Sequence, residues 1–113
     1  GPIEYWRSVP VRVTSYSPCR LGVSGCSSTT ASGATLKKGI AAVRVVWYRL
    51  MHGQTVYVPD YGTAVIEDTG GGVDGTNRWI DLGYSDDDFI GWSTSSTLYF
   101  LTPIPEEVPW VLP

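Results

Sequence analysis

The sequence predicts an all-β fold, namely a small β-barrel with one or two short helical turns. A chain of 113 residues suits one compact domain with a single core. Hydrophobic residues make up 42% of the chain, and 13 glycines and 8 prolines divide it into short apolar runs. Many short strands joined by tight turns have this composition.

The first strand is expected at Val9–Ser17, where apolar and polar residues alternate. The segment Cys19–Gly33 is small and polar without an apolar period, so it is expected to be a loop. Ile40–Val46 is a nearly continuous, β-branched apolar run. This run predicts a strand buried on both faces, which Trp47 and Tyr48 extend.

Short strands separated by turn residues make up the rest of the barrel. They are expected at Thr55–Val58, Thr63–Glu67, Trp79–Leu82 and Thr97–Leu101, which brings the number of strands to six. Ser85 is a suitable N-cap, and three aspartates follow it, so a short helix is expected through Trp92. Trp47, Trp79 and Trp92 are expected in the core because large aromatic side chains dominate small cores.

Three segments are expected along the chain. Residues 1–8 form a lead-in, where Gly1-Pro2 resembles the remnant of a cleaved tag, residues 9–102 form the barrel, and residues 103–113 form a Pro-rich extended tail. No apolar run approaches the ~20 residues of a membrane span, so no transmembrane segment is expected. A net charge of −3 with scattered basic residues argues against nucleic acid as a partner. We expect a monomer.

Cys19 and Cys26 are seven positions apart in the polar loop. This spacing favours a disulfide, which indicates an extracytoplasmic location, over two free thiols or a metal site. His52 is the only histidine and precedes a glycine turn, so further zinc ligands are hard to find, and we assign no metal.

Two carboxylates are candidates for acid chemistry. Asp68 ends an apolar run before Gly70-Gly71-Gly72, and Asp81 lies in the next apolar segment. Burial disfavours a charged carboxylate and raises its pKa. A carboxyl that keeps its proton near neutral pH is what general acid catalysis requires.

Five ordered blocks of the sequence resemble the three-aspartate, or 3D, domain. They are Val13-Thr14-Ser15-Tyr16-Ser17-Pro18-Cys19, Thr30-Ala31-Ser32-Gly33, Gly53-Gln54-Thr55-Val56-Tyr57-Val58-Pro59-Asp60-Tyr61-Gly62, Glu67-Asp68-Thr69-Gly70-Gly71 and Ile80-Asp81-Leu82. The resemblance covers roughly residues 12–102. It implies a six-stranded double-psi β-barrel, as in membrane-bound lytic transglycosylase A and in the resuscitation-promoting and stationary-phase survival proteins of bacteria.

The resemblance also implies an activity on peptidoglycan or a related polysaccharide. The enzymes of this kind cleave the MurNAc–GlcNAc bond and leave a 1,6-anhydro sugar. Their catalytic acid matches Asp81, and its companion matches Asp68. The third aspartate best matches Asp86, although Asp86–Asp88 also suits a solvated helix start.

Further residues of the matching blocks are candidate sugar contacts. Tyr16 and Thr30 belong to blocks that flank the family's cleft, although a strand tyrosine also suits core packing. Gly70 and Gly71 let the backbone approach a sugar closely. Asp68 has a second interpretation, as an Asx-turn that caps the glycine loop.

The sequence departs from the family in three places. Tyr84 and Ser85 occupy the region of the family's third aspartate, and Asp86–Asp88 follow just beyond it. The family's Asp-Pro after the buried strand is replaced by Val46-Trp47, and residues 72–78 form a longer loop with an aspartate in place of a lysine. We therefore carry three functions forward. They are a lytic transglycosylase with Asp81 as general acid and base, a noncatalytic expansin-like glycan-binding module, and a structural domain of an envelope or phage-associated protein.

Overall fold

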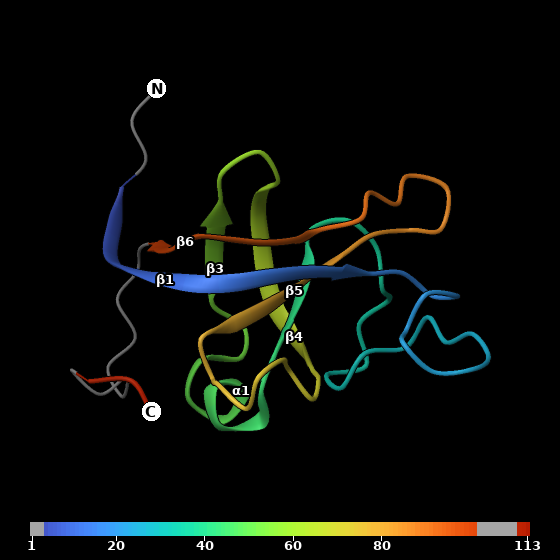
Figure 1. Ribbon diagram of the computed structural model, residues 1–113, viewed down its shortest axis with the longest axis horizontal. Helices are drawn as coiled ribbons and strands as arrows, with labels where there is room; N and C mark the ends of the chain where they lie inside the picture. The colour runs from blue at the N-terminus through green and yellow to red at the C-terminus, as the bar shows by residue number, and fades with distance from the viewer. Residues whose placement is uncertain (1–3, 102–110) are drawn as a thin grey trace.

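The computed structural model describes residues 4–101 and 111–113, and these residues form a closed barrel of six strands with one short helix (Figure 1). The strands are β1 (Tyr5–Tyr16), β2 (Ile40–Val43), β3 (Thr55–Val58), β4 (Gly62–Thr69), β5 (Trp79–Gly83) and β6 (Ser93–Leu101), and the helix is α1 (Val45–Met51). The predicted fold class, a small all-β barrel with six strands, is confirmed.

Most strands lie where the sequence predicts them, with longer bounds. β3 has the predicted limits, whereas β1 begins at Tyr5, four residues before the expected start and within the expected lead-in. β4 continues past Glu67 to Thr69, and β6 begins at Ser93. The predicted tail falls mainly on residues 102–110, outside the described part of the chain. Pro113 is described, and its backbone oxygen accepts a 2.8 Å hydrogen bond from Trp47 Nε1.

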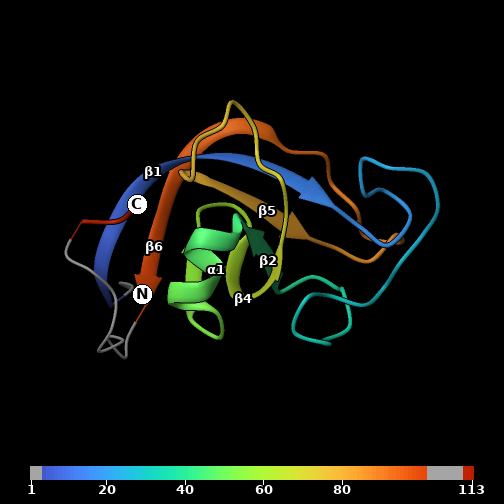
Figure 2. The same ribbon diagram turned by 90° about the horizontal axis from the view of Figure 1, so that it is seen from below.

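Two predicted elements are wrong. The buried strand ends at Val43, and Trp47 and Tyr48 belong to α1 instead of extending it. Trp47 and Met51 lie one helical turn apart and are both buried, so burial of this face outweighs the β propensity of the valines. Figure 2 shows α1 beside β2 and β4. The helix expected after Ser85 is a turn, in which the Ser85 N–H donates to Asp88 Oδ1 at 2.8 Å.

The strand order around the barrel is β1-β5-β2-β4-β3-β6. β1 and β5 are parallel, as are β2 and β4, while β2 and β5 between them are antiparallel. Renaming β1–β3 as β4–β6 and the reverse leaves every neighbour and every direction unchanged, and β1·β6 and β3·β4 are both antiparallel. The two halves of the chain therefore interlock with a pseudo-two-fold relation.

The core lies inside the barrel, and a second apolar cluster lies on its outer face. Val13, Ile80 and Leu82 belong to the interior core. Tyr16 and Ala42 have the opposite orientation and pack with residues of the segment between β1 and β2. Figure 2 shows this segment at the end of the molecule opposite the start of β1. Successive residues of a strand point to opposite faces, so the same strands supply both clusters.

Strand register aligns four residues across the outer face. Thr14 of β1 is paired with Asp81 of β5, Asp81 with Ala42 of β2, and Ala42 with Asp68 of β4. We call these four residues the central row. The row places the two aspartates on either side of a single alanine, because a register shift between Ala41 and Ala42 brings Asp68 opposite Ala42.

Candidate functional site

A pocket of about 360 Å³ lies over the central row. Its floor comes from the four central strands, one wall is the loop that follows β4, and Leu21 joins it from the segment between β1 and β2. The lining residues are Thr14, Tyr16, Leu21, Ala42, Asp68, Thr69, Gly70, Gly71, Gly72, Val73, Trp79 and Asp81. The pocket therefore contains four predicted site residues besides Asp81, namely Tyr16, Asp68, Gly70 and Gly71.

Asp81 occupies the β5 side of the pocket and is partly buried. Its Oδ1 accepts a 2.8 Å hydrogen bond from the hydroxyl of Thr14. Burial raises the pKa of Asp81 to about 6, the negative charge of Asp68 adds to this increase, and the bond from Thr14 opposes it. Asp81 thus exchanges its proton close to neutral pH, as the sequence predicts for a buried carboxyl.

Thr14 connects Asp81 to Trp79. The indole Nε1 of Trp79 donates to Thr14 Oγ1 at 2.9 Å, and Thr14 donates in turn to Asp81. Trp79 is buried, as predicted, but it also lines the pocket. Three side chains from two parallel strands therefore form a continuous hydrogen-bonded chain.

Asp68 occupies the β4 side of the pocket and has three donors. Its Oδ1 accepts from the N–H groups of Ala31 and Thr69, both at 2.9 Å, and its Oδ2 accepts from the Tyr16 hydroxyl at 2.8 Å. The Thr69 contact is local. The Ala31 contact, in contrast, attaches the loop that precedes β2 to strand β4. Asp68 is therefore held as an acceptor on both oxygens.

Tyr16 ends β1 and is buried next to Asp68. Burial raises the pKa of the Tyr16 phenol above its ordinary value, and the charge of Asp68 raises it further. The phenol consequently stays neutral and keeps the proton that it donates to Asp68. Tyr16 is both a core residue and a pocket residue, so the two interpretations of this strand tyrosine hold together.

The glycine loop fits closely around other side chains. A Cβ at Gly70 would lie 2.6 Å from Cη2 of Trp79, so only a glycine leaves room for this indole. Gly72 has a φ of +77°, and a Cβ there would lie 2.9 Å from Cδ of Arg44. Gly71, in contrast, has open space around it. Of the two predicted sugar contacts in this loop, Gly71 is open to a ligand and Gly70 accommodates Trp79.

Asp86 and Thr30 lie outside the lining of the pocket. Asp86 Oδ1 accepts from the Cys19 N–H at 3.0 Å and from the Ser17 hydroxyl at 2.7 Å, and these bonds lower the pKa of Asp86. Asp86 also pairs with Arg20 at 3.4 Å. The Thr30 hydroxyl donates to the Ala34 carbonyl oxygen at 3.0 Å within its own turn. Both residues stabilise the segment that carries Leu21 and Ala31.

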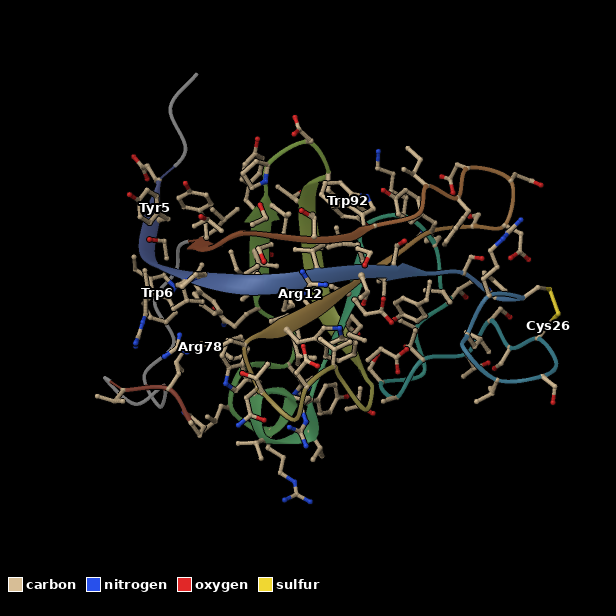
Figure 3. The ribbon with its side chains drawn as sticks, viewed as in Figure 1. Tyr5, Trp6, Arg12, Cys26, Arg78 and Trp92 are labelled. Carbon is tan, nitrogen blue, oxygen red and sulfur yellow. A yellow bond between two sulfur atoms is a disulfide. The ribbon has the colours of Figure 1, made fainter. Side chains whose placement is uncertain are left out.

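The predicted disulfide between Cys19 and Cys26 is present. Figure 3 shows it at the outer edge of the segment between β1 and β2. Leu21 lies within the ring that this disulfide closes, so the cross-link supports one wall of the pocket. Within residues 4–101 and 111–113, no group of three or more His, Cys, Asp or Glu side chains could hold a metal ion. No helix of the same residues is long and apolar enough to cross a membrane.

A larger hollow of about 550 Å³ lies elsewhere, between α1 and residues 111–113. Its lining, as far as the described residues form it, is mostly apolar and contains Arg49 but neither aspartate nor glutamate. The carboxylates Asp68 and Asp81, in contrast, line the smaller pocket over the central row.

Two functional candidates, Thr14 and the Trp79 indole N–H, were not predicted. The alternation in β1 places Thr14 on the same face as Tyr16, and the alternation in β5 places Trp79 on the same face as Asp81. These patterns are visible in the sequence. The pairing of β1 with β5, which brings Thr14 next to Asp81, is not.

Comparison of the chain with protein-family models, with curated proteins and with solved structures gives no match. The chemistry of the pocket is therefore judged from its own side chains. They provide one carboxyl with a pKa of about 6, a second carboxyl engaged by three donors, and an open backbone at Gly71.

Proposed function

We propose that this protein is a lytic transglycosylase that cleaves the MurNAc–GlcNAc β-1,4 bond of peptidoglycan, with Asp81 as general acid and base. The observation that carries this proposal is the Asp81 carboxyl, which lines a pocket and has a pKa of about 6. A group with this pKa can both donate and accept a proton near neutral pH. The resemblance to the 3D domain supports the choice of substrate.

In the first step, protonated Asp81 donates to the glycosidic oxygen while the bond to the anomeric carbon of MurNAc breaks. Positive charge then develops on the sugar ring in an oxocarbenium-like transition state. Asp68, held on the other side of the pocket, stabilises this charge. Its three donors keep it in place.

In the second step, the 6-hydroxyl of the same MurNAc attacks the anomeric carbon. Its proton passes to the Asp81 carboxylate, which regenerates the acid and leaves a 1,6-anhydro ring. No water molecule takes part in the reaction, so no second carboxylate is needed to activate a water. This agrees with a pocket in which Asp68 has both oxygens engaged by protein donors.

The disulfide supports action outside the cytoplasm, where peptidoglycan is found. Structural disulfides persist in oxidising compartments. The bridge between Cys19 and Cys26 encloses Leu21, so an oxidising environment also preserves the pocket wall. We therefore propose an extracytoplasmic protein.

A noncatalytic glycan-binding barrel is the second candidate. The observation that favours it is the position of Asp86, which anchors Ser17 and Cys19 instead of lining the pocket. Only two of the three aspartates that the family resemblance singles out, Asp68 and Asp81, thus line the pocket. Binding without cleavage needs neither of them as an acid.

Mass spectrometry of the soluble products from purified peptidoglycan tests the proposal. Wild-type protein is expected to release muropeptides lighter by one water than the hydrolytic products, and Asp81→Asn none. Asp87→Asn, an exposed aspartate of the 86–88 turn, is the matched control and is expected to retain the products. Binding without products from folded wild-type protein would favour the glycan-binding module, whereas products from Asp81→Asn would exclude Asp81 as the acid.

A further inference from the structure

The hydrogen bonds around Asp81 have a direction that the side-chain chemistry determines. An indole N–H is only a donor, so the proton between Trp79 Nε1 and Thr14 Oγ1 belongs to Trp79. Thr14 has one hydroxyl proton, and Asp81 Oδ1, at 2.8 Å, is its acceptor. This chain therefore runs one way, from Trp79 through Thr14 to Asp81.

The direction of the chain distinguishes the two oxygens of Asp81. Oδ1 accepts the hydrogen bond from the Thr14 hydroxyl, and it does so in both protonation states of Asp81. Oδ2 has no hydrogen-bond partner among residues 4–101 and 111–113. A proton on Oδ1 would leave the Thr14 hydroxyl without an acceptor in a partly buried place, which costs free energy. The exchangeable proton is thus held on Oδ2.

From this geometry we infer that Thr14 and Trp79 are positioning residues, which orient Asp81 so that Oδ2 carries the proton given to the substrate. The transfer of the Oδ2 proton to a substrate rests on the proposed function, whereas the orientation of Asp81 by Thr14 and Trp79 does not. Neither residue exchanges a proton with the substrate in this role.

Gly70 belongs to the same arrangement. A Cβ at this position would lie 2.6 Å from Cη2 and 3.3 Å from Cζ3 of the Trp79 indole. An alanine there requires the ring to move, and the ring carries the Nε1–H that orients Thr14. Gly70 thus affects the orientation of Asp81 through Trp79 and Thr14. A Cβ at the neighbouring Gly71 would have no atom within 4 Å.

The electrostatic surroundings of Asp81 allow the effect to be measured. Among the described residues, Asp68 from β4 is the charged group that acts on Asp81, and the phenol of Tyr16 from β1, which also lines the pocket, is neutral. The Thr14 hydrogen bond stabilises the carboxylate and lowers the pKa of Asp81. Losing this bond must therefore raise that pKa.

The experiment is a carboxyl ¹³C NMR titration of the full chain, with the Asp81 signal assigned by its absence in Asp81→Asn. Thr14→Val keeps the shape of the side chain and removes the hydroxyl, so the pKa of Asp81 is expected to rise by about one unit. Thr14→Ser keeps the donor and is expected to titrate as wild type. Trp79→Phe removes the donor to Thr14 and is expected to give a smaller rise.

The two neighbouring glycines provide a matched pair. Gly70→Ala is expected to raise the pKa of Asp81 as Trp79→Phe does, and Gly71→Ala is expected to leave it unchanged. An unchanged titration in Thr14→Val, or equal shifts in the two glycine variants, would overturn the proposal. If Gly70→Ala does not fold, the Thr14 variants, which differ from wild type by very few atoms, decide the matter.

A kinetic measurement separates this inference from the proposed function. If peptidoglycan is cleaved, Thr14→Val is expected to move the basic limb of the pH–rate profile upward by the same amount as the NMR pKa, because protonated Asp81 is the active form. If no variant cleaves peptidoglycan but the titrations behave as expected, the positioning role holds and the proposed reaction fails.

Discussion

The two aspartates of the central row differ in the hydrogen-bond donors that surround them. On the β1/β5 side, Asp81 accepts one hydroxyl donor, from Thr14, and no donor of the described residues reaches its other oxygen. On the β2/β4 side, Asp68 accepts two backbone N–H groups and the Tyr16 hydroxyl. Both positions lie on parallel strand pairs that the pseudo-two-fold relation exchanges.

The difference shows that donors, and not strand position, decide what each carboxyl can do. Three donors hold both oxygens of Asp68 as acceptors and fix the position of its side chain. One donor does not offset the cost of burial, so the pKa of Asp81 reaches about 6. One backbone architecture thus places a carboxyl with a raised pKa and a carboxyl held by three donors on opposite sides of Ala42.

The strongest test of this contrast is loss of the acid. Asp81→Asn is expected to lower the rate of peptidoglycan cleavage by about 10²–10⁴-fold, the range that general acid–base catalysis contributes. Its free energy of unfolding at pH 7.5 should not fall, because a buried charge is removed. Rates of product release and urea denaturation measure the two effects. A variant that unfolds would instead indicate a structural role for Asp81.

The pH dependence of stability gives the next largest effect. The pKa of Asp81 is raised from 3.8 to about 6 in the folded protein, so the protonated form is favoured by folding. Its contribution is fully present below pH 3.8 and is lost as the pH rises through 6, by about 3 kcal/mol in total. Urea denaturation between pH 3.5 and 7.5, with Asp81→Asn as reference, measures it. A flat difference between the two proteins would contradict the raised pKa.

On the other side of the row, Tyr16→Phe removes one donor from Asp68. A hydrogen bond to a charged acceptor contributes about 1.5–3 kcal/mol, so the free energy of unfolding is expected to fall by about 2 kcal/mol. Tyr48→Phe on α1 is the control, because its ring stacks on His52 and its hydroxyl has no partner among the described residues. Equal effects of the two variants would mean that the Tyr16 hydroxyl does not stabilise Asp68.

The smallest effect concerns the coupling between the two aspartates. Asp68→Asn removes the like charge that raises the pKa of Asp81, so that pKa is expected to fall by less than one unit. It should stay above 3.8, because burial is the larger cause. NMR titration of Asp81 measures the shift, and Asp87→Asn serves as control. A fall to 3.8 would make Asp68, and not burial, the main cause.

Most strands could be predicted from the sequence, because short runs of alternating apolar and polar residues between glycines and prolines favour few conformations other than a strand. β3 was located to the residue, and its neighbours differ mainly in length. α1 could not be predicted, since Val45 and Val46 favour a strand by propensity. Packing of Trp47 and Met51 in the core decides its conformation, and such packing is not visible in a single local segment.

The site was predicted in part. Asp81 and Asp68 were predicted as a pair, and the structure brings both into one pocket. The turn at Asp86 was predicted as a helix, because its capping pattern is local, whereas its actual partners, Ser17 and Cys19, lie almost 70 positions away. Thr14 escaped prediction for the same reason, since its role depends on the parallel pairing of strands 67 positions apart.

The position of β1 determines when this protein can fold. β1 pairs with β5 on one side and β6 on the other, so the first strand of the chain has no partner until the last two are available. Pairings between strands distant in sequence form slowly, because a long loop must close before any contact stabilises it. The barrel and its pocket must therefore form together and late, once the whole domain has emerged from the ribosome or the translocation channel. The ring between Cys19 and Cys26 spans only a short segment and can close before that point.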